Sequence, residues 1–137
     1  MVPSGLNELL NTQESALRVR EARQEILASN IANADTPNYK ARDINFSAAL
    51  KQVAESRQAV NGKLPLTTTA GAHLTGGGSS PISGAIQYRN DQQGSIDGND
   101  VDIDKERIQL TDNGMNYEAT VTLISAQIHN MLAVIQG

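Results

Sequence analysis

The C-terminal part of this 137-residue chain carries a heptad pattern, and no other feature restricts the fold as strongly. Apolar residues recur there at alternating spacings of four and three, which is typical of a helix that buries a seam in a coiled coil. The pattern predicts a helix over residues 106–137, with Gly114 as the weak position in its seam. The other seam positions are Leu110, Tyr117, Val121, Ile124, Ile128, Met131 and Ile135.

The positions that flank this seam are almost free of charge. An exposed two-stranded coiled coil usually places charged pairs there, but only Glu118 is charged among Thr111, Glu118, Ser125, Leu132, Asn113, Thr120, Gln127 and Val134. Leu123 and Ala133 spread the apolar surface further around the last two turns. A helix that is apolar nearly all round is buried on several sides.

The N-terminal part predicts a second long amphipathic helix, from residue 4 to about residue 34. Ser4 is a candidate N-cap, and the helix should stop before Thr36 and Pro37, because proline pushes its predecessor out of the α region. Gln13, Arg20 and Gln24 interrupt its apolar stripe. One such helix cannot cover the C-terminal helix, so other chains in an open helical array should supply the missing contacts.

The middle of the chain differs in composition, since residues 61–98 hold eight of the eleven glycines. Short strands are predicted at residues 64–69 and 85–89, where β-branched and aromatic residues suit a small hairpin. The fold class is therefore mainly α, with long N- and C-terminal helices that pair as a coiled coil around a small irregular or β-containing middle. We divide the chain into a helix at 1–36, an extended segment and short helix at 37–60, a loop or β region at 61–105, and the heptad helix at 106–137.

Composition argues against several classes of function. A net charge of −4 gives no general attraction to nucleic acid, and an aromatic content of 3% disfavours a deep pocket for a small-molecule substrate. With two histidines and no cysteine, the chain shows no zinc motif, and the glycine run at 76–78 lacks the Lys-Ser/Thr of a phosphate-binding loop. We therefore expect neither an enzyme nor a cofactor.

The acidic run DGNDVDIDKE, residues 97–106, leaves an alternative open, because closely spaced Asp and Asn oxygens suit calcium. It does not fit an EF-hand. The competing interpretation is a turn at Asp97 and Gly98, followed by a short segment with Val101 and Ile103 inward that leads into the C-terminal helix. The alternative function is a soluble coiled-coil dimerisation module with a calcium-responsive loop.

The run SNIANADTPNYKARDINF, residues 29–46, combines a helix end, a turn and an extended exit. Asn30 and Asn33 could hydrogen-bond across a helix contact. In the turn Thr36-Pro37-Asn38-Tyr39, proline fixes one φ, and Asn38 can take the positive φ of a type II turn or the bridge position of a type I turn. We expect this turn to position Tyr39 and Phe46 against a neighbouring subunit, and we include Ile44 in the predicted interface. The alternative is an ordinary helix stop.

The run closely resembles the N-terminal signature of the bacterial flagellar rod and hook proteins, and its ending KARDINF is similar to that of the proximal rod members. The resemblance covers nearly the whole chain, since TTTAGAHL at 67–74, DGNDVDIDKE and the terminal VIQG also look like that family. Two positions depart from it. Asn38 stands where the family usually has Gly, and Asp100 stands where a neutral polar residue is common.

The resemblance implies a structural subunit of the flagellar basal-body rod, whose coiled-coil helices stack into the tube that drives motility. It implies self-association and three kinds of partner: other rod subunits, the junction protein beneath the rod, and the export gate. It also implies a periplasmic location, reached through the flagellar type III export apparatus without a cleaved signal peptide, which agrees with the start MVPSGLNELL.

Overall fold

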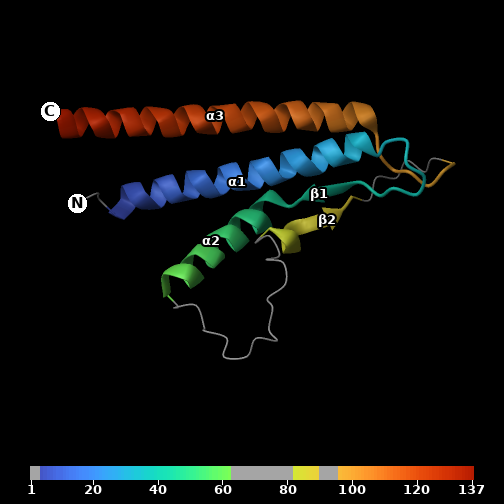
Figure 1. Ribbon diagram of the computed structural model, residues 1–137, viewed down its shortest axis with the longest axis horizontal. Helices are drawn as coiled ribbons and strands as arrows, with labels where there is room; N and C mark the ends of the chain where they lie inside the picture. Colours follow the sequence, from blue (N-terminus) through green and yellow to red (C-terminus); the bar gives the residue numbers. More distant parts are fainter. Residues whose placement is uncertain (1–3, 63–81, 90–95) are drawn as a thin grey trace, which may run out of the picture.

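The computed structural model describes residues 4–62, 82–89 and 96–137. Two long helices dominate it: α1, Ser4–Ala32, and α3, Ile103–Gln136. They run in opposite directions and lie side by side along the long axis of the molecule (Figure 1). The predicted fold class, mainly helical with paired N- and C-terminal helices and a small strand-containing middle, is confirmed.

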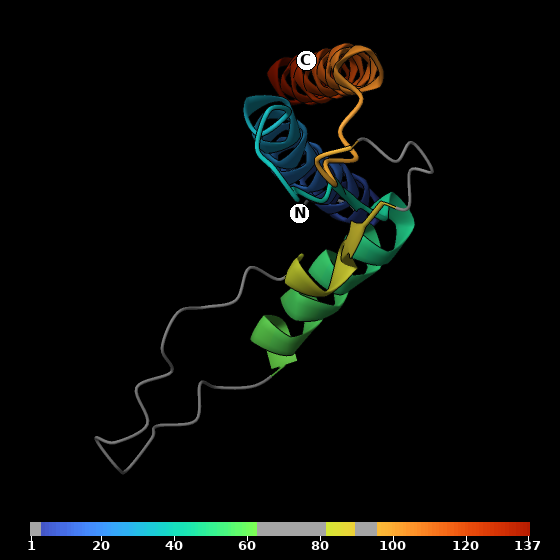
Figure 2. The same ribbon diagram turned by 90° about the vertical axis from the view of Figure 1, so that its right-hand side faces the viewer.

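Helix α1 lies between two layers. Helix α3 covers one side of it, and α2, Phe46–Gly62, covers the other together with a small two-stranded sheet (Figures 1 and 2). The hydrophobic core sits on the α2 side. Its buried members are Val19, Ile26, Ile44, Ala49, Val53, Ile82 and Ala85. The apolar residues of α1 therefore pack mainly against the middle of the chain.

The two-stranded sheet pairs β1, Arg42–Ile44, with β2, Ile86–Tyr88, in antiparallel register, with Ile44 opposite Ile86. A short 3-10 helix, η1, Ser83–Ala85, precedes β2. The predicted strand at 85–89 is thus confirmed, but its partner comes from the segment after the turn. The other predicted strand, at 64–69, lies outside the described residues.

Two helix boundaries follow from local chemistry. Phe46 opens α2 rather than continuing the extended exit, because the Asn45 side chain accepts a hydrogen bond from the Ala48 amide at 3.1 Å and caps the helix. Helix α3 begins at Ile103 because the Asp102 carboxylate accepts from the amides of Asp104 and Lys105. The Asp97–Asp102 stretch therefore serves as the turn and cap that lead into α3.

Candidate assembly surface

The turn after α1 has one of the two predicted geometries, the one with a positive φ at Asn38. Asn38 has φ 61°, and the Tyr39 amide donates to the Thr36 carbonyl at 3.3 Å, which closes a four-residue turn. Gly98 has φ 76° and faces this turn so closely that a Cβ there would stand 2.6 Å from the Asn38 Oδ1. Thr36, Pro37 and Asn38 are exposed at the end of the molecule.

Asn99 fastens this turn to the end of α1. Its Nδ2 lies 3.0, 2.7 and 2.8 Å from the carbonyl oxygens of Asn33, Ala34 and Thr36. These three carbonyls follow the last residue of α1, and Asn99, which is only 5% exposed, bonds them to the segment that precedes α3. The sequence did not predict this role of Asn99, because the acidic run at 97–106 was interpreted only as one motif.

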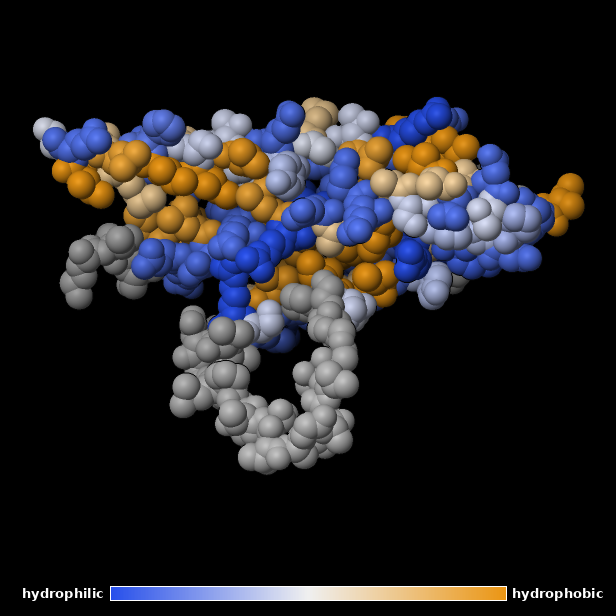
Figure 3. Space-filling view, in the orientation of Figure 1, coloured by the Kyte–Doolittle hydropathy of each residue, from blue (hydrophilic) through white to orange (hydrophobic). Residues whose placement is uncertain are grey.

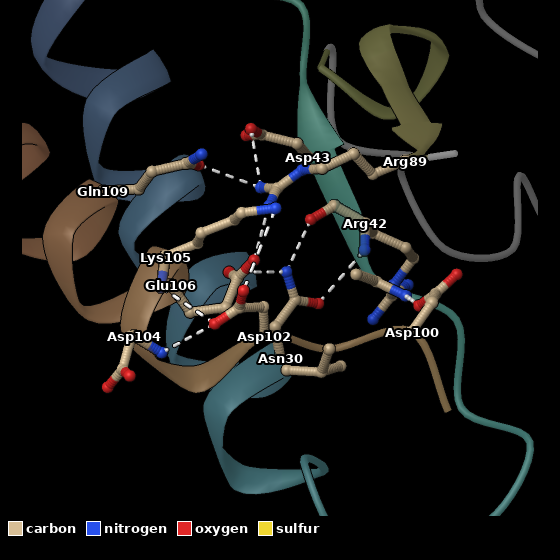
Figure 4. Close-up of polar contacts among 12 residues, drawn as sticks. Asn30, Arg42, Asp43, Arg89, Asp100, Asp102, Asp104, Lys105, Glu106 and Gln109 are labelled. Carbon is tan, nitrogen blue, oxygen red and sulfur yellow. Dashed lines mark hydrogen bonds and ion pairs between the residues drawn. The ribbon is translucent and has the colours of Figure 1, made fainter. Parts of the chain in front are cut away.

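A partly buried ionic network joins α1, β1, the residue after β2 and the start of α3 (Figure 4). Glu106 of α3 is fully buried, and it accepts hydrogen bonds from Arg89, which follows β2, and from Asn30 of α1. Arg89 also donates to Asp43 of β1 at 2.9 Å, and Arg23 of α1 donates to the same carboxylate at 2.9 Å. Ion pairs thereby connect four segments that are distant in sequence.

Charge pairing in this network shifts two pKa values. Burial alone would raise the pKa of Asp43, but hydrogen bonds from Arg23 and the Ile44 amide and the nearby positive charges hold it below its ordinary value. Burial likewise opposes the charge on Arg89, yet Glu106 and Asp43 raise the pKa of its guanidinium. The charged forms of these groups are the ones that the fold stabilises.

Asn30, a predicted partner contact, is an internal residue. Its Nδ2 donates to the Arg42 carbonyl at 2.7 Å and to Glu106 at 3.0 Å, and its Oδ1 accepts from the Arg42 amide and the Tyr39 hydroxyl. These four bonds use the full capacity of an amide side chain. Asn30 and Ile44 are both buried in the isolated chain, at 0% and 6% exposure.

The other predicted contacts near the turn are half-buried. Asn33 donates to the Ser29 carbonyl and accepts from Thr36, so it closes the end of α1. Tyr39 bonds to Asn30, and Phe46 packs against the core and beneath the Arg20 guanidinium, 4.8 Å from its ring centre. The residues predicted from the sequence therefore include side chains that stabilise the turn from within the chain and side chains that are exposed on the turn.

The acidic run supports the backbone rather than a metal ion. Asp100 accepts from the Ala41 amide at 2.6 Å, Asp97 accepts from the Asn99 amide, and Asp102 caps α3. Among the described residues, no three His, Cys, Asp or Glu side chains are grouped so that they could hold a metal. These carboxylate contacts give the alternative of a calcium-responsive module no support.

Helix α3 is turned differently from the predicted seam. The residues that it buries are Glu106, Asn113 and Thr120, which are polar. Asn113 donates to the Arg20 carbonyl at 2.9 Å and to Gln24 Oε1 at 2.8 Å on α1. The positions predicted to flank the seam at Asn113 and Thr120 thus face α1.

Only part of the predicted seam shares in this burial. Leu110, Ile124 and Met131 are half-buried, whereas Tyr117, Val121, Ile128 and Ile135 are 38%, 39%, 43% and 80% exposed. Polar side chains occupy the contact with α1, and these four apolar side chains stay exposed. The prediction that α1 alone cannot cover the heptad helix agrees with this exposure.

An apolar surface remains on α3 from its middle to its C-terminal end, where hydrophobic side chains gather in Figure 3. At 100° per residue its members fall within about 60° of arc on the helix. We call it the outer stripe, and it consists of Tyr117, Val121, Ile128, Leu132 and Ile135. Such a contiguous apolar strip on a surface marks a site of interaction.

A groove of about 610 Å³ runs between α1 and α3 beside the outer stripe. Tyr117, Gly114 and Ala28 line it, and a Cβ at Gly114 would meet no atom within 4 Å. Glu21, Glu25 and Glu118 add acidic side chains to its walls. The missing side chain at Gly114 leaves room for an atom of another molecule.

No helix within the described residues is both long and apolar enough to cross a membrane.

Comparison with known proteins agrees with this architecture. Residues 10–40 match the family model described as flagella basal body rod protein. The chain is 43% identical over 132 residues to the flagellar basal body rod protein FlgB of Escherichia coli (strain K12), a match that covers 96% of each chain. It is 45% identical over 134 residues to FlgB of Proteus mirabilis (strain HI4320), covering 96% of this chain and 98% of that one.

The paired long helices and these full-length similarities define a structural subunit of the bacterial flagellar basal-body rod, a component of the motility organelle. Within that class, the chain belongs to the FlgB family.

Proposed function

We propose that this rod subunit assembles with its neighbours through the outer stripe of α3 and the exposed turn Thr36-Pro37-Asn38. The observation that carries the proposal is the exposure of the five apolar side chains of the outer stripe in a chain whose own core lies on the far side of α1. Burying apolar surface stabilises by about 25 cal/mol per Å². Covering several such side chains would therefore contribute several kcal/mol to each contact in the rod.

The half-buried residues Leu110, Ile124 and Met131 lie at the border between the contact with α1 and the outer stripe. A neighbouring helix laid on the stripe would touch them as well. We include them in the proposed interface for that reason, and we omit Asn30 and Ile44, which the chain buries itself.

The partners that we propose are other rod subunits, including further copies of this chain, the junction protein beneath the rod, and the export gate. The subunit has a structural and not an enzymatic role, in the periplasmic rod, and it is exported without a cleaved signal peptide. The names of its relatives, which are rod proteins, support the first of these partners. The others follow from the family resemblance.

The test is Ile128→Asp, which places a carboxylate in the centre of the outer stripe. A charge buried without a partner is strongly unfavourable, so we expect loss of motility in soft agar and loss of intact basal bodies. Asn130→Asp is the matched control, because it adds the same charge two residues away on an exposed part of α3 outside the stripe. Normal motility with Ile128→Asp would contradict the proposed interface.

A further inference from the structure

Helix α3 carries two alternative seams that share Leu110, Ile124 and Met131. One is completed by the inner row, which consists of Glu106, Asn113, Thr120 and Gln127 and faces α1. The other is completed by the apolar residues Val121, Ile128 and Ile135. Adjacent residues are 100° apart on a helix, and each seam is centred midway between its own row and the shared residues. A rotation of α3 by about 50° would therefore replace one seam by the other.

The observed rotation is not the one that apolar burial alone would select. It buries three polar residues while Val121, Ile128 and Ile135 stay on the surface. Within the described residues, Asn113 Oδ1 and Gln127 Oε1 are buried and make no hydrogen bond. Since burying a polar atom without a partner is unfavourable, some other interaction must hold α3 in this rotation.

Two residues of the inner row make specific bonds that depend on the rotation. Glu106 bonds to Asn30 and Arg89, and Asn113 bonds to Gln24 and the Arg20 carbonyl. A turn of about 50° moves a side chain on a helix surface by roughly 5 Å, which is beyond hydrogen-bond reach. These bonds therefore exist in the observed rotation and are lost in the other.

We propose that Glu106 and Asn113 form a rotational lock that keeps the outer stripe of α3 on the surface of the unassembled subunit. A buried polar residue that fixes register at the expense of stability is a known device in coiled coils. Without the lock, α3 turns its apolar row onto α1. The significance of the stripe rests on the proposed function, but the rotation of α3 in the isolated chain is testable without assembly.

The absence of cysteine from the chain gives a clean readout of this rotation. Thr120 is 7% exposed and Val121 is 39% exposed, although they are adjacent on α3. We would introduce Thr120→Cys and Val121→Cys separately and measure the rate of alkylation by N-ethylmaleimide in the isolated full chain. With the lock intact, the cysteine at 120 reacts slowly and the cysteine at 121 reacts fast.

The lock is released by the double variant Glu106→Leu with Asn113→Leu, in which Arg89 keeps its bond to Asp43. We expect the order to reverse, with the rate at position 120 rising and that at 121 falling by roughly tenfold each. The matched control is Asn116→Leu with Glu118→Leu, since both side chains are exposed on the same helix and the original order should persist. If circular dichroism shows that the double variant has lost helicity, Asn113→Leu alone, which keeps the Glu106 network, should shift both rates in the same directions.

Unchanged rates in the released variants would overturn the lock. Fast reaction at both positions would overturn it too, because α3 would then have left α1 instead of turning on it. Fast reaction at position 120 in the parent chain would show that the inner row does not face α1 before assembly. Failure of the proposed function is seen separately, as normal motility with Ile128→Asp.

Discussion

The two ends of the helix pair differ in how far the chain completes its own structure. At the closed end, where α1 stops and α3 begins, Asn30, Glu106, Arg89 and Asn99 bond to several segments of the same chain. At the open end, the last turns of α3 display Leu132, Val134 and Ile135 at 47%, 82% and 80% exposure. The closed end is thus completed within the chain, whereas the open end carries the apolar surface that we propose other subunits cover.

The difference is chemical as well as geometric. The closed end is held by directional bonds and charges, which specify one arrangement of the turn, the two-stranded sheet and the start of α3. The open end offers apolar area, which is not directional and adapts to whichever apolar surface covers it. One small chain thus combines a turn held in a fixed position with a helix surface that can pack against different apolar surfaces.

The largest effect on the isolated chain is expected from Arg89→Ala, which attacks the closed end. It leaves the fully buried Glu106 without its cationic partner, and breaking such a buried pair costs about 3–5 kcal/mol. Urea unfolding monitored by circular dichroism measures the loss. Arg18→Ala is the control, because its exposed pair with Glu14 should contribute about 0.5 kcal/mol or less.

Prediction from the sequence was most successful where a residue type strongly favours one backbone conformation. Pro37 and Asn38 predicted the turn, with a positive φ at Asn38 as one of two conformations, and β-branched and aromatic residues predicted β2. The heptad spacing predicted α3 and its excess of apolar surface.

It was less successful where a role depends on what lies across a contact. Asn113 and Thr120 are neutral polar residues at flanking positions of the predicted seam, and only the carbonyl of Arg20 and the amide of Gln24 show that Asn113 belongs in the contact. Arg89 and Glu106 are 17 residues apart along the chain, and nothing in their spacing indicates a pair. A short polar motif cannot reveal partners that folding brings from another segment.

The turn at the closed end gives the next largest effect. Asn38→Val puts a β-branched residue at φ 61°, where a non-glycine residue is strained by about 1–2 kcal/mol. Asn38→Gly removes the strain and should be tolerated. Soft-agar motility and the yield of basal bodies compare the two variants, and equal behaviour would mean that this backbone geometry does not matter for assembly.

Acid should weaken the closed end by a smaller amount. The pKa of Asp43 is lower in the folded chain than its ordinary value of 3.8, so its contribution to stability is present above that value and is lost as pH falls through the folded pKa. We expect the free energy of unfolding to decrease below about pH 4, and Asp43→Asn to flatten part of that decrease. Urea titrations at several pH values measure both slopes, and identical slopes would exclude a contribution from Asp43.

The smallest effect on the isolated chain is expected at the open end. Ile128→Ser removes an apolar side chain that is already 43% exposed, so the free energy of unfolding should change by about 1 kcal/mol or less. A loss as large as that of Arg89→Ala would mean that the chain itself buries Ile128, and the contrast between the two ends would fail.

The contrast between the two ends is tested most directly by measuring whether assembly protects the outer stripe from alkylation. A single cysteine at Val121 is alkylated in the isolated chain and in purified basal bodies, with denatured samples giving the total thiol in each. Rapid reaction in the isolated chain and strong protection in the basal body are the expected result. Equal reactivity in both would contradict the central claim, because the stripe would then remain uncovered in the assembled rod.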